Sequence, residues 1–127
     1  MDDLYSKVLE RDAFSEAVSL WIDPKSYSAL NKVRNMIPQA AIYEQMAEEC
    51  AELAQALLKK ARKIRGENYT PKTHEEINND ICEEFTDVIL CAKAIGLTYS
   101  KSTMNQKLNR WVSRNSDMEG EKNTEDN

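Results

Sequence analysis

Apolar residues recur along this chain at the 3.6-residue spacing of α-helices, and short polar breaks separate the segments. The pattern predicts helices over about 4–21, 27–36 and 100–114, and two long helices, from Pro38 to Gly66 and from Thr73 to Gly96. Glycine and proline number only three each, which is too few for the many turns of an all-β fold. The expected fold is therefore all-α, a bundle of four to five helices.

Each of the two long helices carries one continuous apolar stripe. The first stripe comprises Ile42, Met46, Cys50, Leu53, Leu57, Ala61 and Ile64, and the second comprises Ile77, Ile81, Phe85, Val88, Ala92 and Ile95. Stripes with this period are expected to be buried where helices pack, and the short connection between these two helices favours an antiparallel pair. Thr73 and Glu76 form a capping box that predicts the start of the second helix.

The length of 127 residues suits one domain with one modest core, expected over residues 1–115. The segment 116–127 is acidic and lacks an apolar period, so it is predicted to be a disordered tail. Five acidic residues against one lysine give this tail a charge of -4, out of the net -5 of the chain. The body is therefore close to neutral and lacks the basic face that binding of duplex nucleic acid requires.

The remaining composition indicates a cytoplasmic protein. Cys50, Cys82 and Cys91 form no CxxC pair, and their odd number and helical placement are typical of reduced packing residues. No apolar run is long enough for a membrane span, and no signal peptide is visible. We therefore expect no membrane partner.

The same carboxylate arrangement appears on both long helices. On the first, Glu49 and Glu52 lie about 60° and 120° from the centre of the apolar stripe. On the second, Glu84 and Asp87 lie at about the same two angles, on the same side of their stripe. If the helices pack antiparallel, a local two-fold relation brings these four carboxylates together.

Four carboxylates at close range repel one another, so a cation must compensate them or some must be protonated. Oxygen ligands alone suit a hard cation such as Mg²⁺ or Mn²⁺. The only histidine, His74, is not spaced as a ligand, which argues against zinc and against a di-iron bundle. Glutamates beside an apolar stripe usually belong to a solvent-exposed face of the helix. We interpret Glu48 and Glu83 in this way, because both point well away from the stripe. The remaining four carboxylates form two clusters at the same angles on adjacent helices, and this repetition favours a metal site over a solvated face.

Basic residues extend the hypothesis toward phosphate binding. Lys59 and Lys60 lie two turns beyond Glu52, near the same edge of the helix. On the last expected helix, donors are offered along roughly one side by Asn105, Lys107, Arg110 and Arg114. Carboxylates that hold metal ions beside lysine and arginine are typical of a polyphosphate site. The alternative is that these cations are surface residues or pair with glutamates.

At these residues the sequence resembles the MazG-like all-alpha nucleoside triphosphate pyrophosphohydrolases, which include dimeric dUTPases and dCTP pyrophosphatases. The family signature of Glu-Glu-x-x-Glu followed by Glu-x-x-Asp is matched by residues 48–52 and 84–87. The later Asn-x-Lys-x-x-Arg pattern is matched by Asn105, Lys107 and Arg110. The resemblance covers about 39–114, and "RGENYTP" is similar to the loop of short phage-type and Firmicute-type members.

The resemblance implies a hydrolase that converts a nucleoside triphosphate, (d)NTP, to the monophosphate and pyrophosphate, in nucleotide metabolism. Mg²⁺, which Mn²⁺ can replace, would be bound by Glu49, Glu52, Glu84 and Asp87. The metal would bridge the triphosphate and position a water for attack at the α-phosphorus. Either Glu48 or Glu52 would take the proton of that water, and Lys59, Asn105, Lys107 and Arg110 would bind phosphate. The family also implies a homodimer or homotetramer.

Two other functions stay open at this point. The chain is alternatively a non-catalytic helical bundle that binds a nucleotide or a protein partner, or a different oxygen-ligated metal protein. The presence of all four expected ligands favours activity. Metal-dependent release of pyrophosphate separates the enzyme from both alternatives.

Overall fold

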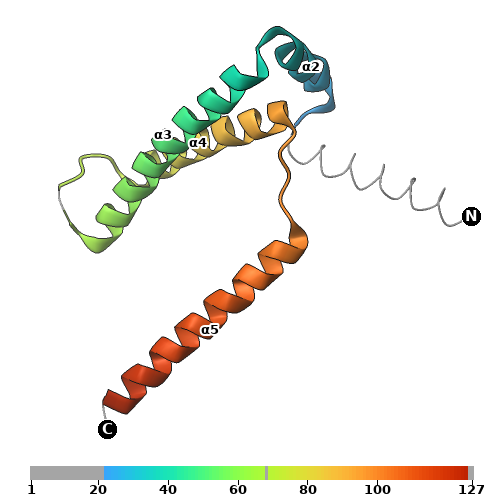
Figure 1. Ribbon diagram of the computed structural model, residues 1–127. Coiled ribbons are helices and arrows are strands. Elements are labelled where there is room, and N and C mark those ends of the chain that lie inside the picture. Colours follow the sequence, from blue (N-terminus) through green and yellow to red (C-terminus); the bar gives the residue numbers. More distant parts are fainter. Residues whose placement is uncertain (1–21, 68, 126–127) are drawn as a thin grey trace, which may run out of the picture. The chain divides into compact units, whose positions relative to one another are not determined.

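The computed structural model describes residues 22–67 and 69–125, and all regular structure in these ranges is helical (Figure 1). The elements are the 3-10 turn η1 (Pro24–Ser26) and the helices α2 (Tyr27–Met36), α3 (Gln39–Arg65), α4 (His74–Ile95) and α5 (Lys101–Glu125). The helix expected over 4–21 lies outside the described residues. With four α-helices and no strand in the described ranges, the all-α prediction is confirmed.

The two long helices end where their local chemistry predicts. Gly66 follows α3 in the left-handed region with φ +70°, and its N–H donates to the carbonyl oxygens of Arg62 and Lys63. At the start of α4, the Thr73 hydroxyl oxygen accepts from the backbone N–H of Glu76 at 3.1 Å, so the predicted cap is confirmed. A left-handed glycine is the common end of a helix because it lacks the Cβ that makes this conformation costly.

Helices α3 and α4 lie side by side as an antiparallel hairpin, as the short connection predicts (Figure 1). Contacts of two α3 lysines close the loop end of the hairpin. The Nζ atom of Lys60 lies 2.8 Å from Nδ1 of His74, and Nζ of Lys63 donates to the carbonyl oxygen of Thr70 at 3.4 Å. The short helix α2 contacts α4.

The apolar stripes are less buried than the sequence predicts. The buried apolar residues in the described ranges are Ile42, Ala56, Ile77 and Ala94. Four members of the expected stripes are exposed: Cys50, and the larger Leu57, Ile64 and Phe85, with exposed fractions of 48%, 67% and 46%. The expectation that these four are buried is wrong, because two helices cover only part of each other's apolar surface.

The line of contact between the two helices lies on the carboxylate side of the stripes. Ala56 is buried, and it lies about 80° from Met46 in the direction of Glu49. Leu57 and Phe85 lie on the other side of their stripes and are left at the surface. The packing therefore brings the glutamates toward the seam between α3 and α4 and leaves an apolar edge uncovered.

The second compact unit of the chain consists mainly of helix α5. The chain divides into two compact units at Gly96 and Leu97, where no boundary is predicted. Helix α5 continues to Glu125, beyond the expected end at Arg114, so the segment predicted to be disordered is helical through most of its length. No proline interrupts this stretch, and its glutamate, lysine and methionine residues favour a helix.

None of the described helices is both long enough and apolar enough to cross a membrane.

Candidate functional site

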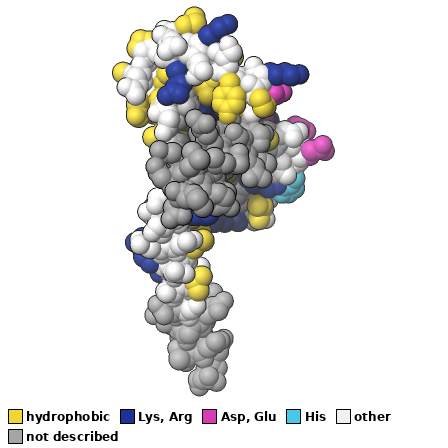
Figure 2. Space-filling view, turned by 90° about the vertical axis from the view of Figure 1, so that its right-hand side faces the viewer, with side chains coloured by type: hydrophobic (Ala, Val, Ile, Leu, Met, Phe, Trp, Pro, Cys, Tyr) yellow, Lys and Arg dark blue, Asp and Glu magenta, His cyan; other side chains and the backbone are white. Residues whose placement is uncertain are grey.

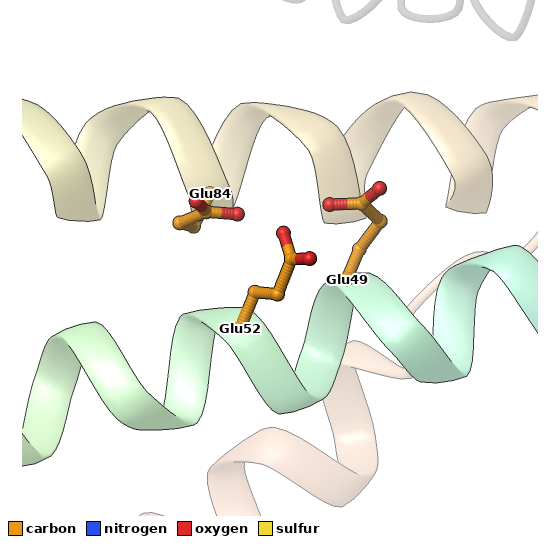
Figure 3. A group of neighbouring side chains, drawn as sticks. All are labelled: Glu49, Glu52 and Glu84. Carbon is orange, nitrogen blue, oxygen red and sulfur yellow. The ribbon is translucent and has the colours of Figure 1, made fainter.

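Three glutamates meet between α3 and α4. Glu49 and Glu52 come from α3 and Glu84 comes from α4, and one carboxylate oxygen of each lies within 4.8 Å of the others. Figure 3 shows the three carboxylates in the space between the two helices. Three of the four metal ligands predicted from the sequence are therefore brought together.

The local fold explains why these side chains converge. The i and i+3 spacing of Glu49 and Glu52 places both on one side of α3, and that side turns toward α4. Ala56 is buried two turns after Glu49, on the same side of α3, where its small side chain allows the helices to approach closely. The carboxylates are thus held by two long helices rather than by a loop.

Two carboxylate oxygens of this group are buried without a hydrogen-bond partner. They are Oε2 of Glu49 and Oε2 of Glu84, and both side chains are half-buried. The other oxygen of Glu49, Oε1, accepts from Nε2 of Gln45 at 2.7 Å. A buried acceptor without a partner is costly and rare in proteins. These two oxygens are therefore positions where a cation or a proton would be stabilised.

The pKa of Glu84 is raised above its ordinary value. Burial is the first cause, because it disfavours the charged carboxylate. A side-chain hydrogen bond with Glu52 and the negative charges of Glu52, Asp87 and Glu49 raise the pKa further. The negative charges of the neighbouring carboxylates thus act together on the Glu84 carboxyl group.

Asp87, the fourth predicted ligand, is half-buried and lies outside the group of three. Its charge nevertheless acts on that group, because it contributes to the raised pKa of Glu84. It also raises the pKa of the Cys91 thiol, as do burial, which is the largest cause, and the charge of Glu49. Asp87 is therefore close enough to add negative charge, and a shift of its side chain would be needed for direct ligation.

The remaining predicted site residues are more scattered. Glu48 and Lys59 are exposed on α3, outside the group of three. Asn105, Lys107 and Arg110 belong to α5, in the second unit of the chain. Lys107 and Arg110 line a depression along α5 that Asn105 does not line. Since a helix turns about 100° per residue, Asn105 lies on another side of α5 from these two cations, not on the same side.

Sequence reasoning missed Gln45 and Cys91. Gln45 orients Glu49 through the hydrogen bond to Oε1. The i and i+4 spacing of Gln45 and Glu49 is a signal that could have found this pair. Cys91 was interpreted only as a packing residue, and its relation to Glu49 depends on the register of α3 against α4, which the sequence does not specify.

The group presents only oxygen donors, from three carboxylates on two rigid helices. Such a donor set suits a hard divalent cation better than zinc or copper, which favour nitrogen and sulfur ligands. No family model matches the chain, and no curated protein or solved structure matches it either.

Proposed function

We propose that this protein is a Mg²⁺-dependent nucleoside triphosphate pyrophosphohydrolase of the MazG-like all-alpha superfamily. It would convert a (d)NTP to the monophosphate and pyrophosphate. The observation that carries the proposal is the pair of buried, unpartnered oxygens of Glu49 and Glu84 within a group of three carboxylates. A divalent cation would give both oxygens a partner and offset the repulsion that raises the pKa of Glu84.

The residues present fit a hard divalent cation. Glu49, Glu52 and Glu84 would hold it, with Asp87 as a fourth ligand that its position on α4 keeps within electrostatic reach. When bound, Mg²⁺ or Mn²⁺ neutralises phosphate charge and acidifies water. Gln45 would keep Glu49 oriented through the 2.7 Å hydrogen bond to Oε1.

Glu52 is the better candidate for the general base. It is exposed and belongs to the group of three, whereas Glu48 is exposed but lies outside that group. In the proposed reaction, a water oxygen bonds to the α-phosphorus and the bond from that phosphorus to the bridging oxygen of pyrophosphate breaks. Glu52 would accept the proton that the water loses.

Cations of the chain would bind the phosphates. Lys59 is exposed about two helical turns beyond Glu52. It would reach the outer phosphates of a substrate held at the carboxylates. Lys107 and Arg110, which lie in the same depression along α5, would supply further positive charge for the phosphates. Asn105 has weaker support, since it lies on another side of α5.

The proposal includes a homodimer or homotetramer in the cytoplasm. The exposed apolar edge that includes Leu57 and Phe85 supports assembly, because a second copy would cover it. The described cysteines, Cys50, Cys82 and Cys91, are all free thiols, which suits a reducing compartment.

The test is release of pyrophosphate from a panel of canonical and modified (d)NTPs, each with Mg²⁺, with Mn²⁺ and with EDTA. We expect release that requires the metal and yields the monophosphate. Glu84→Gln is expected to lose this release. The matched control is Glu83→Gln, which is expected to keep it, since Glu83 is an exposed neighbour of Glu84 outside the group of three. If the protein binds triphosphates but hydrolyses none of them, the result would contradict the proposal and favour a non-catalytic binding module.

A further inference from the structure

The loop end of the α3–α4 hairpin carries a dense group of cations. The segment 59–72 contains six lysine and arginine residues and one glutamate, a charge of +5, and Glu75 and Glu76 at the start of α4 reduce it to +3. In Figure 2 the only histidine, in cyan, lies at the surface with basic side chains, in dark blue, beside it. The near-neutral charge of the body is thus an average, and this end of the hairpin is basic. The cations are Lys59, Lys60, Arg62, Lys63, Arg65 and Lys72.

Much of this positive charge is left unneutralised. Within residues 22–67 and 69–125, Lys72 is paired, since its Nζ atom donates to Oδ2 of Asp80 at 2.6 Å. In the same ranges Arg62 and Arg65 form no ion pair. These two arginines are three residues apart, so they lie on one side of α3. Their guanidinium groups are therefore available to an anion outside the chain, and arginine binds phosphate through paired hydrogen bonds.

Lys60 and Lys63 place further charge on another side of α3, toward the loop. Nζ of Lys60 lies 2.8 Å from Nδ1 of His74, and Nζ of Lys63 donates to the carbonyl oxygen of Thr70. A lysine has donors only, so Nδ1 accepts in this contact and both lysines face uncharged groups. The helix dipole favours cations in the last turn of α3, which includes Lys63. Lys60 lies before that turn, so the dipole alone does not account for the cluster.

Tyr69 supplies an aromatic ring beside these cations. It is 93% exposed, and it directly precedes Thr70, whose carbonyl oxygen accepts from Lys63. The loop backbone next to Tyr69 is therefore held at the end of α3, while the ring lies in solvent. An exposed ring next to lysine and arginine is typical of surfaces that bind unpaired nucleotides, where the cations contact phosphates and a base stacks on the ring.

We infer that the loop end of the hairpin binds single-stranded nucleic acid. The phosphates would be bound by four cations, Lys60, Arg62, Lys63 and Arg65, and Tyr69 would stack on one base. A duplex fits this surface less well, because its bases already stack on each other and offer Tyr69 no face. The surface shares no residue with the proposed catalytic site, so it does not depend on the proposed enzymatic activity.

An anionic lipid surface would attract the same cations. Tyr69 is, however, the only large apolar side chain of loop 66–73. Binding at a membrane surface depends on a wider apolar face that enters the lipid. The combination of several cations with one aromatic ring therefore fits a nucleotide chain better.

The test is fluorescence anisotropy of a labelled oligodeoxythymidine of about 15 nucleotides with the full chain, in EDTA and over a range of salt concentrations. We expect binding that weakens as the salt concentration rises. Arg62→Gln/Arg65→Gln is expected to weaken binding at low salt by at least about tenfold. It is also expected to reduce the slope of log K against log salt by about 1.4, since each lost phosphate contact contributes about 0.7. The matched control Lys32→Gln/Arg34→Gln removes the same charge from α2, at the other end of the hairpin, and is expected to bind like wild type (Figure 1).

The contribution of Tyr69 is tested separately from that of the cations. Tyr69→Ala is expected to weaken binding by about five- to 100-fold without a change in the salt slope, because a stacked base makes no phosphate contact. Tyr69→Phe keeps the ring and is expected to bind like wild type. A duplex of the same length is expected to compete at least about tenfold less well than the single strand.

Several results would overturn the inference. They are a wild-type chain that does not bind the oligonucleotide at low salt, equal losses in Arg62→Gln/Arg65→Gln and Lys32→Gln/Arg34→Gln, wild-type binding by Tyr69→Ala, and equal competition by the duplex. A wild-type chain that binds vesicles containing anionic lipid but not the oligonucleotide would identify a membrane-binding surface instead. Circular dichroism of each variant shows that it remains helical. Release of pyrophosphate is expected to be unchanged in Arg62→Gln/Arg65→Gln, so failure of either proposal leaves the other standing.

Discussion

Glu52 on α3 and Glu84 on α4 approach each other across the seam of the helix hairpin, and a hydrogen bond between their side chains helps to raise the pKa of Glu84. Two carboxyl groups can share a hydrogen bond only when one of them carries a proton. A divalent cation would remove the need for that proton. Proton and metal are therefore expected to compete for the same place between the helices, and this competition is measurable.

The first prediction concerns the pH dependence of stability without metal. The pKa of Glu84 in the folded chain is raised above the ordinary value of 4.5, so its ionisation disfavours the folded state. In EDTA, the stability that Glu84 contributes is expected to be complete below that ordinary value and to be lost as the pH rises through the raised pKa. The measurement is the thermal midpoint of wild type and of Glu84→Gln across this range.

Glu84→Gln imitates the protonated carboxyl, so its stability is expected to depend less on pH than that of wild type. The Glu83→Gln chain is expected to follow wild type, because Glu83 is exposed. Parallel pH profiles for wild type and Glu84→Gln would show that the burial of Glu84 and its neighbouring charges have no effect on folding.

The second prediction concerns metal affinity. Glu49→Gln and Glu84→Gln each remove a ligand oxygen and are expected to weaken Mn²⁺ binding by at least about 10- to 100-fold. Glu83→Gln is expected to bind like wild type, since Glu83 lies outside the group of three. Electron paramagnetic resonance of free Mn²⁺ measures the affinity of each chain. Equal affinity in Glu84→Gln and Glu83→Gln would place any metal elsewhere.

The third prediction concerns stabilisation by metal. A cation that binds only the folded chain adds about 2.7 kcal/mol to the free energy of unfolding when its concentration is 100 times Kd. The thermal midpoint of wild type is therefore expected to rise with added Mg²⁺ and to fall back in EDTA. In Glu84→Gln the rise should be largely absent. A rise of the same size in both chains would indicate a general effect of the salt.

The fourth prediction tests the hairpin core. Ile77 is 1% exposed, and Ile77→Ala is expected to cost about 2–5 kcal/mol of unfolding free energy through lost packing. Ile64 lies in the other predicted stripe but is 67% exposed, so Ile64→Ala is expected to change the free energy of unfolding by no more than about 0.5 kcal/mol. Denaturant titration of both variants measures the difference. Similar losses would mean that a further surface covers Ile64 in solution.

The sequence predicted the helices well because their signals are local. The bounds of α2 and the glycines after α3 and α4 were predicted from positions next to each other in the chain. The end of α5 was missed because absence of an apolar period was interpreted as disorder, whereas the helix continues to Glu125. The lack of an apolar period indicates that a segment does not pack against a core. It does not indicate where a helix ends.

The candidate site was predicted in part. The periodicity placed Glu49, Glu52 and Glu84 on matching sides of two helices, and the hairpin brings them together. Periodicity also identified the apolar stripes, but it could not show that the seam runs along one side of them and leaves Leu57 and Phe85 exposed. That depends on which side chains allow close approach, such as Ala56 and Ala94, and so on packing between distant parts of the chain.

The most direct measurement is turnover of triphosphates in ¹⁸O-labelled water with Mg²⁺. The products are separated, and the mass of each is measured by mass spectrometry. Attack at the α-phosphorus places the label in the monophosphate and leaves the released pyrophosphate unlabelled. We expect this pattern for the wild-type chain and for Glu83→Gln, and loss of turnover in Glu84→Gln. Label in pyrophosphate, release of inorganic phosphate alone, or full turnover by Glu84→Gln would contradict the proposed reaction at this site.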